Sequence, residues 1–368
     1  MVFRSVKYNK TLPPDRQLEQ GRWVKLICGA SYQDLPVIRN LALVYTLAGV
    51  DCVDLAADPA VVTAAQAGIA AALPLSEQLG ETARGQAPWL MVSLNDGEDP
   101  HFRKAGFDPS RCPVDCPRPC AAVCPTAAIA PFPNASGSTG VKSEKCYGCG
   151  RCLPICPWGL IETRAQTAPV ATLMPWLQSG QIAAIELHTQ VGHAPQFQRL
   201  WQTLHPSVSQ LKAIAISCPF HRDGIAYLQQ LNQLIQPLPI PVIWQADGRP
   251  MSGDIGRGTT HACIHYGEQV LQAHLPGYVQ LAGGTNAHTI NKVQQKTLAI
   301  HGVAFGSYAR TVLSPMLHQA ELRHHQDGGT GEVQLEAYPD LLAQAIAVAQ
   351  TLVSPWKNRP AITQSNHK

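Results

Sequence analysis

Eight of the twelve cysteines lie between Cys112 and Cys156, at spacings that suit iron–sulfur chemistry. The second four follow the pattern Cys-x2-Cys-x2-Cys-x3-Cys-Pro and are Cys146, Cys149, Cys152 and Cys156. In this pattern three closely spaced thiolates bind one cluster and the fourth reaches a neighbouring cluster. The first four also end in Cys-Pro but are separated by three residues throughout, and are Cys112, Cys116, Cys120 and Cys124. The segment therefore predicts two clusters, one of them bound by a wider motif.

The two motifs together resemble those of bacterial two-cluster ferredoxins, which implies crossed ligation. The regular cluster is then expected to be bound by Cys146, Cys149, Cys152 and Cys124. The other cluster is expected to be bound by Cys112, Cys116, Cys120 and Cys156. We expect a [4Fe–4S] cluster at the regular site. The wider spacing leaves the first site open between a labile [4Fe–4S] cluster and a [3Fe–4S] cluster.

Two structural zinc sites are the main alternative, because soft thiolates also select zinc. Zinc sites usually pair two Cys-x2-Cys units and have no need of two Cys-Pro endings, so the pattern favours iron–sulfur clusters. A disulfide framework is disfavoured by the length of the chain, the cluster-like spacing and the lack of a recognisable signal peptide.

The composition indicates a globular chain, because 368 residues with 45% hydrophobic and 14% charged residues can bury a large core. No apolar run approaches the roughly 18 residues of a membrane span, and the first twenty residues lack the apolar stretch of a signal peptide. We therefore expect a cytoplasmic protein without a membrane span. The formal net charge of +3 counts cysteines as neutral, and two oxidised clusters would lower it to about −1. Nucleic-acid binding is not expected.

Short apolar segments alternate with helical patterns along the chain, which is typical of βα units and a parallel sheet. The predicted strands are residues 23–28, 52–56, 89–94, 182–188, 211–217, 240–245, 278–282 and 301–305. Eight units predict an α/β fold of the (β/α)8 TIM-like barrel type, with the ferredoxin-like segment inserted after the third strand. The alternatives are an open doubly wound sheet or two separate α/β domains. The first strand is not followed by Gly-x-Gly-x-x-Gly, which argues against a dinucleotide-binding fold.

This interpretation divides the chain into five parts. They are an N-terminal arm (1–20), the first three barrel strands (21–106), the iron–sulfur segment (107–162), the remaining barrel strands (163–325), and a C-terminal helix and tail (326–368). The last fifteen residues are expected to be ordered only if something binds them.

Barrel enzymes act at the carboxyl ends of their strands, and the loops after strands seven and eight commonly bind phosphate. The candidates for a phosphate-bearing cofactor such as FMN are Gly283, Gly284, Gly306 and Ser307. The alternative is that these glycines only make tight turns. The sequence offers no lysine near a strand end to face a flavin, and the available cations are Arg249 and Arg257.

Other polar residues near predicted strand ends should face the barrel mouth, most of them as rim residues rather than catalysts. They are Cys28, Asp54, Glu186, His188, Cys218 and Asp247. His261 and His265 are spaced as a helical metal pair but lack an evident third ligand.

The cysteine pattern combines with two C-terminal stretches, DGRPMSGDIGRGTT and GVAFGSYAR, in a chain of this length. The combination resembles the cyanobacterial light-dependent period family. The resemblance implies an iron–sulfur protein on the input side of the circadian clock that reports redox state as a proxy for light. It implies clock-associated proteins, including an input histidine kinase, as partners, and photosynthetic electron carriers as further candidates. The leading hypothesis is a redox sensor, and the alternative is a ferredoxin-coupled oxidoreductase with an FMN-like cofactor or a substrate in the barrel mouth.

Overall fold

The computed structural model describes most of the chain. The described residues are 12–28, 34–78, 87–97, 103–124, 127–129, 140–143, 145–146, 150–165, 170–248, 258–329 and 331–362.

Eight parallel strands close into a barrel in the order β1-β10-β9-β8-β7-β6-β3-β2. They are β1 (Trp23–Ile27), β2 (Cys52–Ala56), β3 (Trp89–Asn95), β6 (Ala184–His188), β7 (Ala213–Pro219), β8 (Val242–Asp247), β9 (Tyr278–Ala282) and β10 (Gly302–Phe305). The prediction of a TIM-like barrel is confirmed, and the open-sheet alternative is wrong. The strands are buried along nearly their whole length, because helices cover the outer face and side chains fill the interior.

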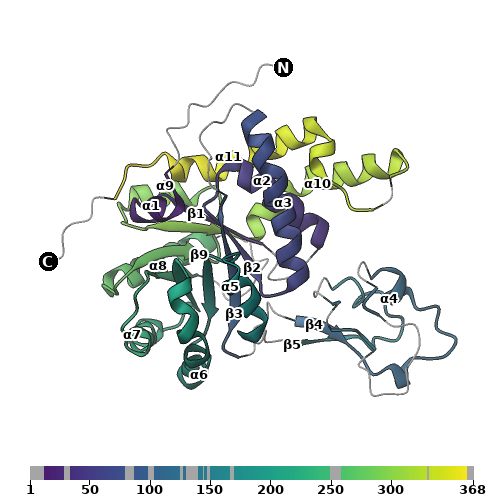
Figure 1. The fold of residues 1–368 in the computed structure, drawn as a ribbon, viewed down its shortest axis with the longest axis horizontal. Coiled ribbons are helices and arrows are strands. Elements are labelled where there is room, and N and C mark those ends of the chain that lie inside the picture. The colour runs from purple at the N-terminus through teal and green to yellow at the C-terminus, as the bar shows by residue number, and fades with distance from the viewer. Residues whose placement is uncertain are drawn as a thin grey trace.

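Helices surround the barrel on its outer face (Figure 1). The α-helices outside the insertion are α1 (Pro14–Glu19), α2 (Leu35–Ala48), α3 (Pro59–Gln78), α5 (Met174–Gln178), α6 (Ala194–Leu204), α7 (Gly224–Ile235), α8 (Thr259–Gln272), α9 (Thr289–Gln295), α10 (Ser307–Gln326) and α11 (Pro339–Lys357). Short 3-10 helices are η1 (Pro109–Arg111), η2 (Val170–Leu173), η3 (His205–Gln210) and η4 (Leu335–Ala337).

The barrel interior is apolar in its amino half and polar in its carboxyl half. The amino half is filled by side chains that include Trp23, Cys52, Trp89 and Ile243. Two residues further along β1, the inward position is occupied by Lys25, which is fully buried. Inward side chains recur every second residue along a strand, so Trp23 and Lys25 belong to successive layers of the barrel interior. The change from an apolar to a charged side chain therefore marks a separate, polar layer.

The inserted segment leaves the carboxyl end of β3 and forms a small module of its own. Its ends pair as an antiparallel ribbon of β4 (Arg103–Gly106) and β5 (Glu162–Ala165), and α4 (Pro119–Ala122) lies between them in the sequence. Figure 1 shows the module projecting from the barrel, with α4 on the side away from it. The module has its own apolar core, built around Phe107, Ile129, Val141 and Ile161.

Among the described residues, two ion pairs join the module to the barrel. Arg151 pairs with Asp34, whose carboxylate also accepts the Val37 N–H at the start of α2. Lys104 Nζ lies 3.2 Å from Asp58 Oδ2, in the loop after β2. Both barrel partners follow the carboxyl ends of strands, so the module attaches at the end where barrel enzymes carry their active sites.

The segment from Ser354 to Ile362 is more ordered than its composition suggests. Helix α11 continues to Lys357 and fully buries Trp356, over whose ring the Arg359 guanidinium lies at 4.6 Å. The Ile362 N–H donates to the Gln20 carbonyl at 3.1 Å. The expectation of a tail that needs a partner is therefore wrong as far as residue 362, because a buried tryptophan fixes the segment against the barrel.

The expectation that no apolar stretch has the length of a membrane span also needs correction. Residues Pro59–Ser76 of α3 are long and apolar enough by length and composition. The helix nevertheless places Val61, Val62 and Ala65 in the core between barrel and helices. This packing buries 39% of this apolar stretch.

Candidate iron–sulfur site and barrel mouth

Seven of the eight cysteines of the two motifs lie in the described part of the chain, and all except Cys116 are in or against the core of the module. Cys120 and Cys152 are buried in that core, and Cys112, Cys124, Cys146 and Cys156 pack against it. Cys149 lies outside the described residues. The structure thus brings together residues from both motifs, which are separated by about twenty residues of sequence.

Two thiols of the first motif, Cys112 and Cys120, have a raised pKa to which neighbouring thiols of both motifs contribute. Burial raises the pKa of Cys112, and the neighbouring thiols of Cys116 and Cys156 raise it further. Burial also raises the pKa of Cys120, with added contributions from Cys156, Cys112 and Cys116. Cys156 comes from the second motif and the other three come from the first. This is the group that crossed ligation requires for the wider site.

Backbone N–H groups are directed at the cysteine sulfurs. Burial would raise the pKa of Cys156, but N–H groups of residues 158–161 donate to its sulfur and hold the pKa below its ordinary value. The Ala128 N–H lies 3.2 Å from Cys124 Sγ. Such hydrogen bonds stabilise a thiolate and tune the potential of a cluster attached to it. The donor set and its amide surroundings therefore fit an iron–sulfur cluster.

Within the described ranges, no three His, Cys, Asp or Glu residues have the geometry to bind a single metal ion. The thiolates of a cluster bind separate iron atoms and stand further apart than the ligands of one zinc ion. Each histidine of the candidate metal pair has another side-chain partner. His261 Nε2 lies 2.9 Å from Lys292 Nζ, and His265 Nε2 lies 3.2 Å from Gln269 Nε2.

A network of charged and polar side chains fills the carboxyl half of the barrel interior. Lys25 Nζ donates to Asp54 Oδ2 at 3.0 Å and to a Glu186 carboxylate oxygen. Ser93 Oγ donates to Asp54 Oδ1 at 2.7 Å, and Gln245 Nε2 donates to Glu186 Oε1 at 2.7 Å. The carboxylates belong to different strands, so the lysine links β1 to both β2 and β6.

The charged groups of Lys25, Asp54 and Glu186 shift one another's pKa values. Burial alone would lower the pKa of Lys25, but Asp54 and Glu186 raise it above its ordinary value. Burial and the Glu186 charge raise the pKa of Asp54 to about 6. Burial would raise the pKa of Glu186, but Lys25 and His188 hold it well below its ordinary value. Lys25 is thus a paired ammonium group rather than a nucleophile.

Lys25 was not among the site residues predicted from the sequence, although a signal was present. The stretch WVKLI has a lysine at its central position, and strand periodicity places that position on the same face as Trp23. Asp54 and Glu186, which were expected at the mouth, instead lie deeper, next to this lysine. His188 ends β6 and reaches Glu186 Oε1 at 3.0 Å, with 19% of its side chain exposed.

The glycine loops occupy the carboxyl ends of the neighbouring strands β9 and β10. Gly283 and Gly284 have φ values of 62° and 114°, which favour glycine. A Cβ on Gly284 would lie 2.7 Å from the Thr259 carbonyl oxygen, so close packing on α8 also requires glycine there. Gly306 and Ser307 stand at the start of α10. A phosphate role for the four residues stays a prediction, and Arg249 and Arg257 lie outside the described residues.

The remaining rim candidates divide by burial. Cys28 and Cys218 are completely buried, and burial raises the pKa of each thiol to about 12. Such thiols are poor nucleophiles at neutral pH. Asp247 ends β8 and is partly exposed at the mouth.

Two family models match the chain. The model of the LdpA Fe–S cluster-binding domain matches residues 112–167, and the model of the Light dependent period A C-terminal domain matches residues 176–355. The curated protein "Light dependent period A" of Synechococcus elongatus is 55% identical over 351 residues, covering 94% of each chain.

Solved structures with a similar chain course include two tryptophan synthase structures. One is the alpha chain from Legionella pneumophila, with a TM-score of 0.37 and 12% identity, covering 94% of this chain and 97% of that one. The other is from M. tuberculosis, with a TM-score of 0.39 and 10% identity, covering 92% and 98%. These similarities are too weak to support any conclusion, and the barrel assignment rests on the observed strand order. The matches to sequence relatives, together with the grouped cysteines, place this chain in the light dependent period A family, as an iron–sulfur protein.

Proposed function

We propose that this protein is a redox sensor whose iron–sulfur module reports cellular electron supply to the machinery that sets a light-dependent period. The observation that carries the proposal is the group of Cys112, Cys116, Cys120 and Cys156, which combines both motifs on a module tied to the barrel by ion pairs. The name of the Synechococcus elongatus relative supports the link to light and period.

The module is proposed to hold two clusters. Cys112, Cys116, Cys120 and Cys156 would bind one of them, as a labile [4Fe–4S] or a [3Fe–4S] cluster. Cys146, Cys149 and Cys152 with Cys124 would bind the other, as a [4Fe–4S] cluster. The bound clusters supply reversible one-electron chemistry, while the protein supplies thiolates, amide donors and a small apolar core.

The contacts of the module suggest how a change of charge reaches the barrel. Arg151 lies next to Cys152, and its guanidinium pairs with Asp34 at the start of α2. An added electron near Arg151 would strengthen the competing attraction on that guanidinium and weaken its pairing with Asp34. The module and the βα loops are therefore proposed to shift relative to each other, exposing a different surface to partners.

The proposed partners are clock-associated proteins, including an input histidine kinase, with photosynthetic electron carriers as the source of electrons. We place the protein in the cytoplasm, where thiolate ligands stay reduced. No catalytic step is needed for this role.

An oxidoreductase is the second candidate, favoured by the glycine loops at neighbouring strand ends and by the charged network below them. A phosphate-bearing cofactor such as FMN would be held by Gly283, Gly284, Gly306 and Ser307. Lys25 would contribute little to a flavin, because two carboxylates already hold its ammonium group. The fit to a flavin is therefore incomplete, and the sensor remains the leading proposal.

Anaerobic purification tests both candidates. The sensor predicts close to eight iron atoms per chain, which is two four-iron clusters, and broad thiolate-to-iron absorption without flavin bands. Fewer than about four iron atoms after reconstitution, or stoichiometric zinc, would contradict the two-cluster proposal. Released FMN would favour the oxidoreductase. Hydrogen exchange of β4, β5 and α2 should then differ between oxidised and reduced protein, and identical exchange would argue against a sensor.

A further inference from the structure

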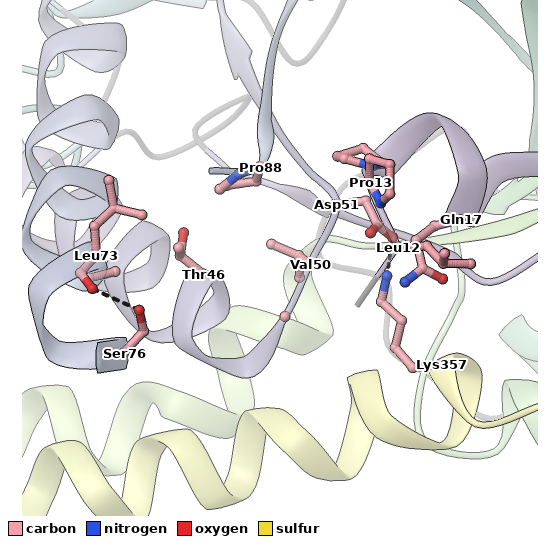
Figure 2. A pocket seen from close by; sticks show the side chains of 13 residues that line it. Leu12, Pro13, Gln17, Thr46, Val50, Asp51, Leu73, Ser76, Pro88 and Lys357 are labelled. Carbon is pink, nitrogen blue, oxygen red and sulfur yellow. Dashed lines mark hydrogen bonds and ion pairs between the residues drawn. The ribbon is translucent and has the colours of Figure 1, made fainter. Parts of the chain in front are cut away.

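A cleft of about 270 Å³ lies at the amino end of the barrel, opposite the end that carries the iron–sulfur module. It is formed by α1, the turn between α2 and β2, the second half of α3 and the end of α11. Figure 2 shows Gln17, Asp51 and Lys357 on one side of the cleft and Thr46, Leu73 and Ser76 on the other.

The charges that line the cleft cancel each other. Lys357 Nζ donates to Asp51 Oδ2, and that oxygen also accepts the Val24 N–H at 2.8 Å. The side chains of the pair are 9% and 6% exposed. Asp51 and Lys357 are the charged residues among the described residues that line the cleft. A ligand with a net charge would therefore meet no unbalanced opposite charge, so the cleft suits a neutral molecule.

Gln17 gives the cleft an unused hydrogen-bond acceptor. Its side chain is 5% exposed, and its Oε1 is buried without a hydrogen-bond partner in the described structure. A buried carbonyl oxygen is costly to leave unsatisfied. A ligand that offers a hydroxyl or N–H group to Gln17 would remove that cost.

The remaining walls combine the hydroxyl-bearing residues Thr46 and Ser76 with an apolar side that includes Leu12, Val50 and Leu73. An apolar cavity of about 150 Å³ is large enough for benzene, so this cleft can hold one ring with a substituent. We propose that the cleft binds a small neutral molecule with an apolar body and one hydroxyl or N–H donor, which hydrogen-bonds to Gln17 Oε1. The proposal does not depend on the redox function of the module.

Phenol and anisole form a matched pair of probes, because they differ by a methyl group on the only donor. Ligand-observed NMR on the full-length, cluster-loaded protein should show phenol binding about fivefold more tightly than anisole, the value of one net hydrogen bond. Gln17→Leu should abolish that preference. Leu73→Trp, on a position that is 39% exposed, should fill the cleft and remove binding of both probes.

Leu322→Trp is the control, because Leu322 is 48% exposed on α10 and does not line the cleft. It should leave both affinities unchanged. Equal binding of phenol and anisole to the wild type would overturn the proposal, as would a phenol preference that survives Gln17→Leu. Absence of binding at millimolar probe, or binding that persists in Leu73→Trp, would overturn it as well. The circular dichroism spectrum of each variant confirms that it is folded.

Discussion

Arg151 and Asp34 form an ion pair between the second cysteine motif and the first turn of α2. Arg151 is half exposed, with 51% of its side chain accessible, whereas Asp34 is 19% exposed and also caps the helix. The pair therefore joins a cluster-binding loop to a structural element of the barrel. It is the contact through which we expect the module and the barrel to influence each other.

Arg151→Gln should loosen the module without unfolding the barrel. Exposed ion pairs contribute about 0–1 kcal/mol, so the melting temperature should change little. Hydrogen exchange in β4 and β5 should become faster, because one of the two ion pairs between described residues of the module and the barrel is lost. Arg222→Gln is the control, since Arg222 is 88% exposed and pairs only with its neighbour Asp223 in the described structure. Unchanged exchange in Arg151→Gln would show that the pair does not hold the module.

Lys25→Met should strongly destabilise the barrel, because it leaves two buried carboxylates without their cation. Removal of one partner from a buried charge pair typically costs about 3–5 kcal/mol. The triple variant Lys25→Met, Asp54→Asn, Glu186→Gln should recover much of that loss. Urea unfolding at neutral pH measures the stability of the single variant and of the triple variant. A single variant as stable as the wild type would mean that the lysine is not paired as described.

Asp54 should make the barrel less stable as the pH rises from about 4 to about 6. Its pKa is raised to about 6 in the folded protein from an ordinary value of 3.8. The folded state therefore holds a proton that the unfolded state has already released, so folding is penalised as the pH passes through this range. Glu186, whose pKa is lowered, contributes in the opposite direction below about pH 4.5.

Asp54→Asn isolates the Asp54 contribution. As the pH rises from 4 to 6, the denaturation midpoint of the wild type should fall relative to that of Asp54→Asn. This trend does not depend on which of the two proteins is more stable overall. Ser110→Ala provides a surface control, because Ser110 is exposed and bonds only Asp108 in the described structure. Parallel pH curves for the wild type and Asp54→Asn would contradict the raised pKa.

The sequence predicted the barrel and the insertion because both depend on periodic signals. Eight apolar strands recur at regular intervals, and the cysteine spacing is specific enough to mark the module. Lys25 was missed because a single inward charge becomes interpretable only when its partners, Asp54 and Glu186, are known to surround it. Their separations of 29 and 161 residues conceal this contact.

The order of residues 354–362 was also predicted incorrectly, for a related reason. These residues include Pro355, and proline ordinarily disrupts helix interiors. In the folded protein, burial of Trp356 and the pairing of Lys357 with Asp51 stabilise the continued helix. Tertiary contacts thus outweigh the local preference.

The cluster proposed for the wider site should be the more sensitive to oxygen. Its cysteines are separated by longer loops, which we expect to hold them less rigidly, and Val114, between Cys112 and Cys116, is 90% exposed. Electron paramagnetic resonance during controlled exposure to air should show its signal decay first. Earlier decay of the signal from the Cys146, Cys149 and Cys152 cluster would contradict this reasoning.

The crossed ligation is the central claim, and Cys156→Ser tests it most directly. Anaerobic samples of this variant, of Cys116→Ser and of Cys146→Ser should be compared by iron content and electron paramagnetic resonance, with Cys28→Ser as a cysteine control outside the module. Crossed ligation predicts that Cys156→Ser and Cys116→Ser lose or alter the same signal and keep the one that Cys146→Ser removes. If Cys156→Ser instead removes the Cys146 signal and leaves the Cys116 signal intact, the assignment is wrong.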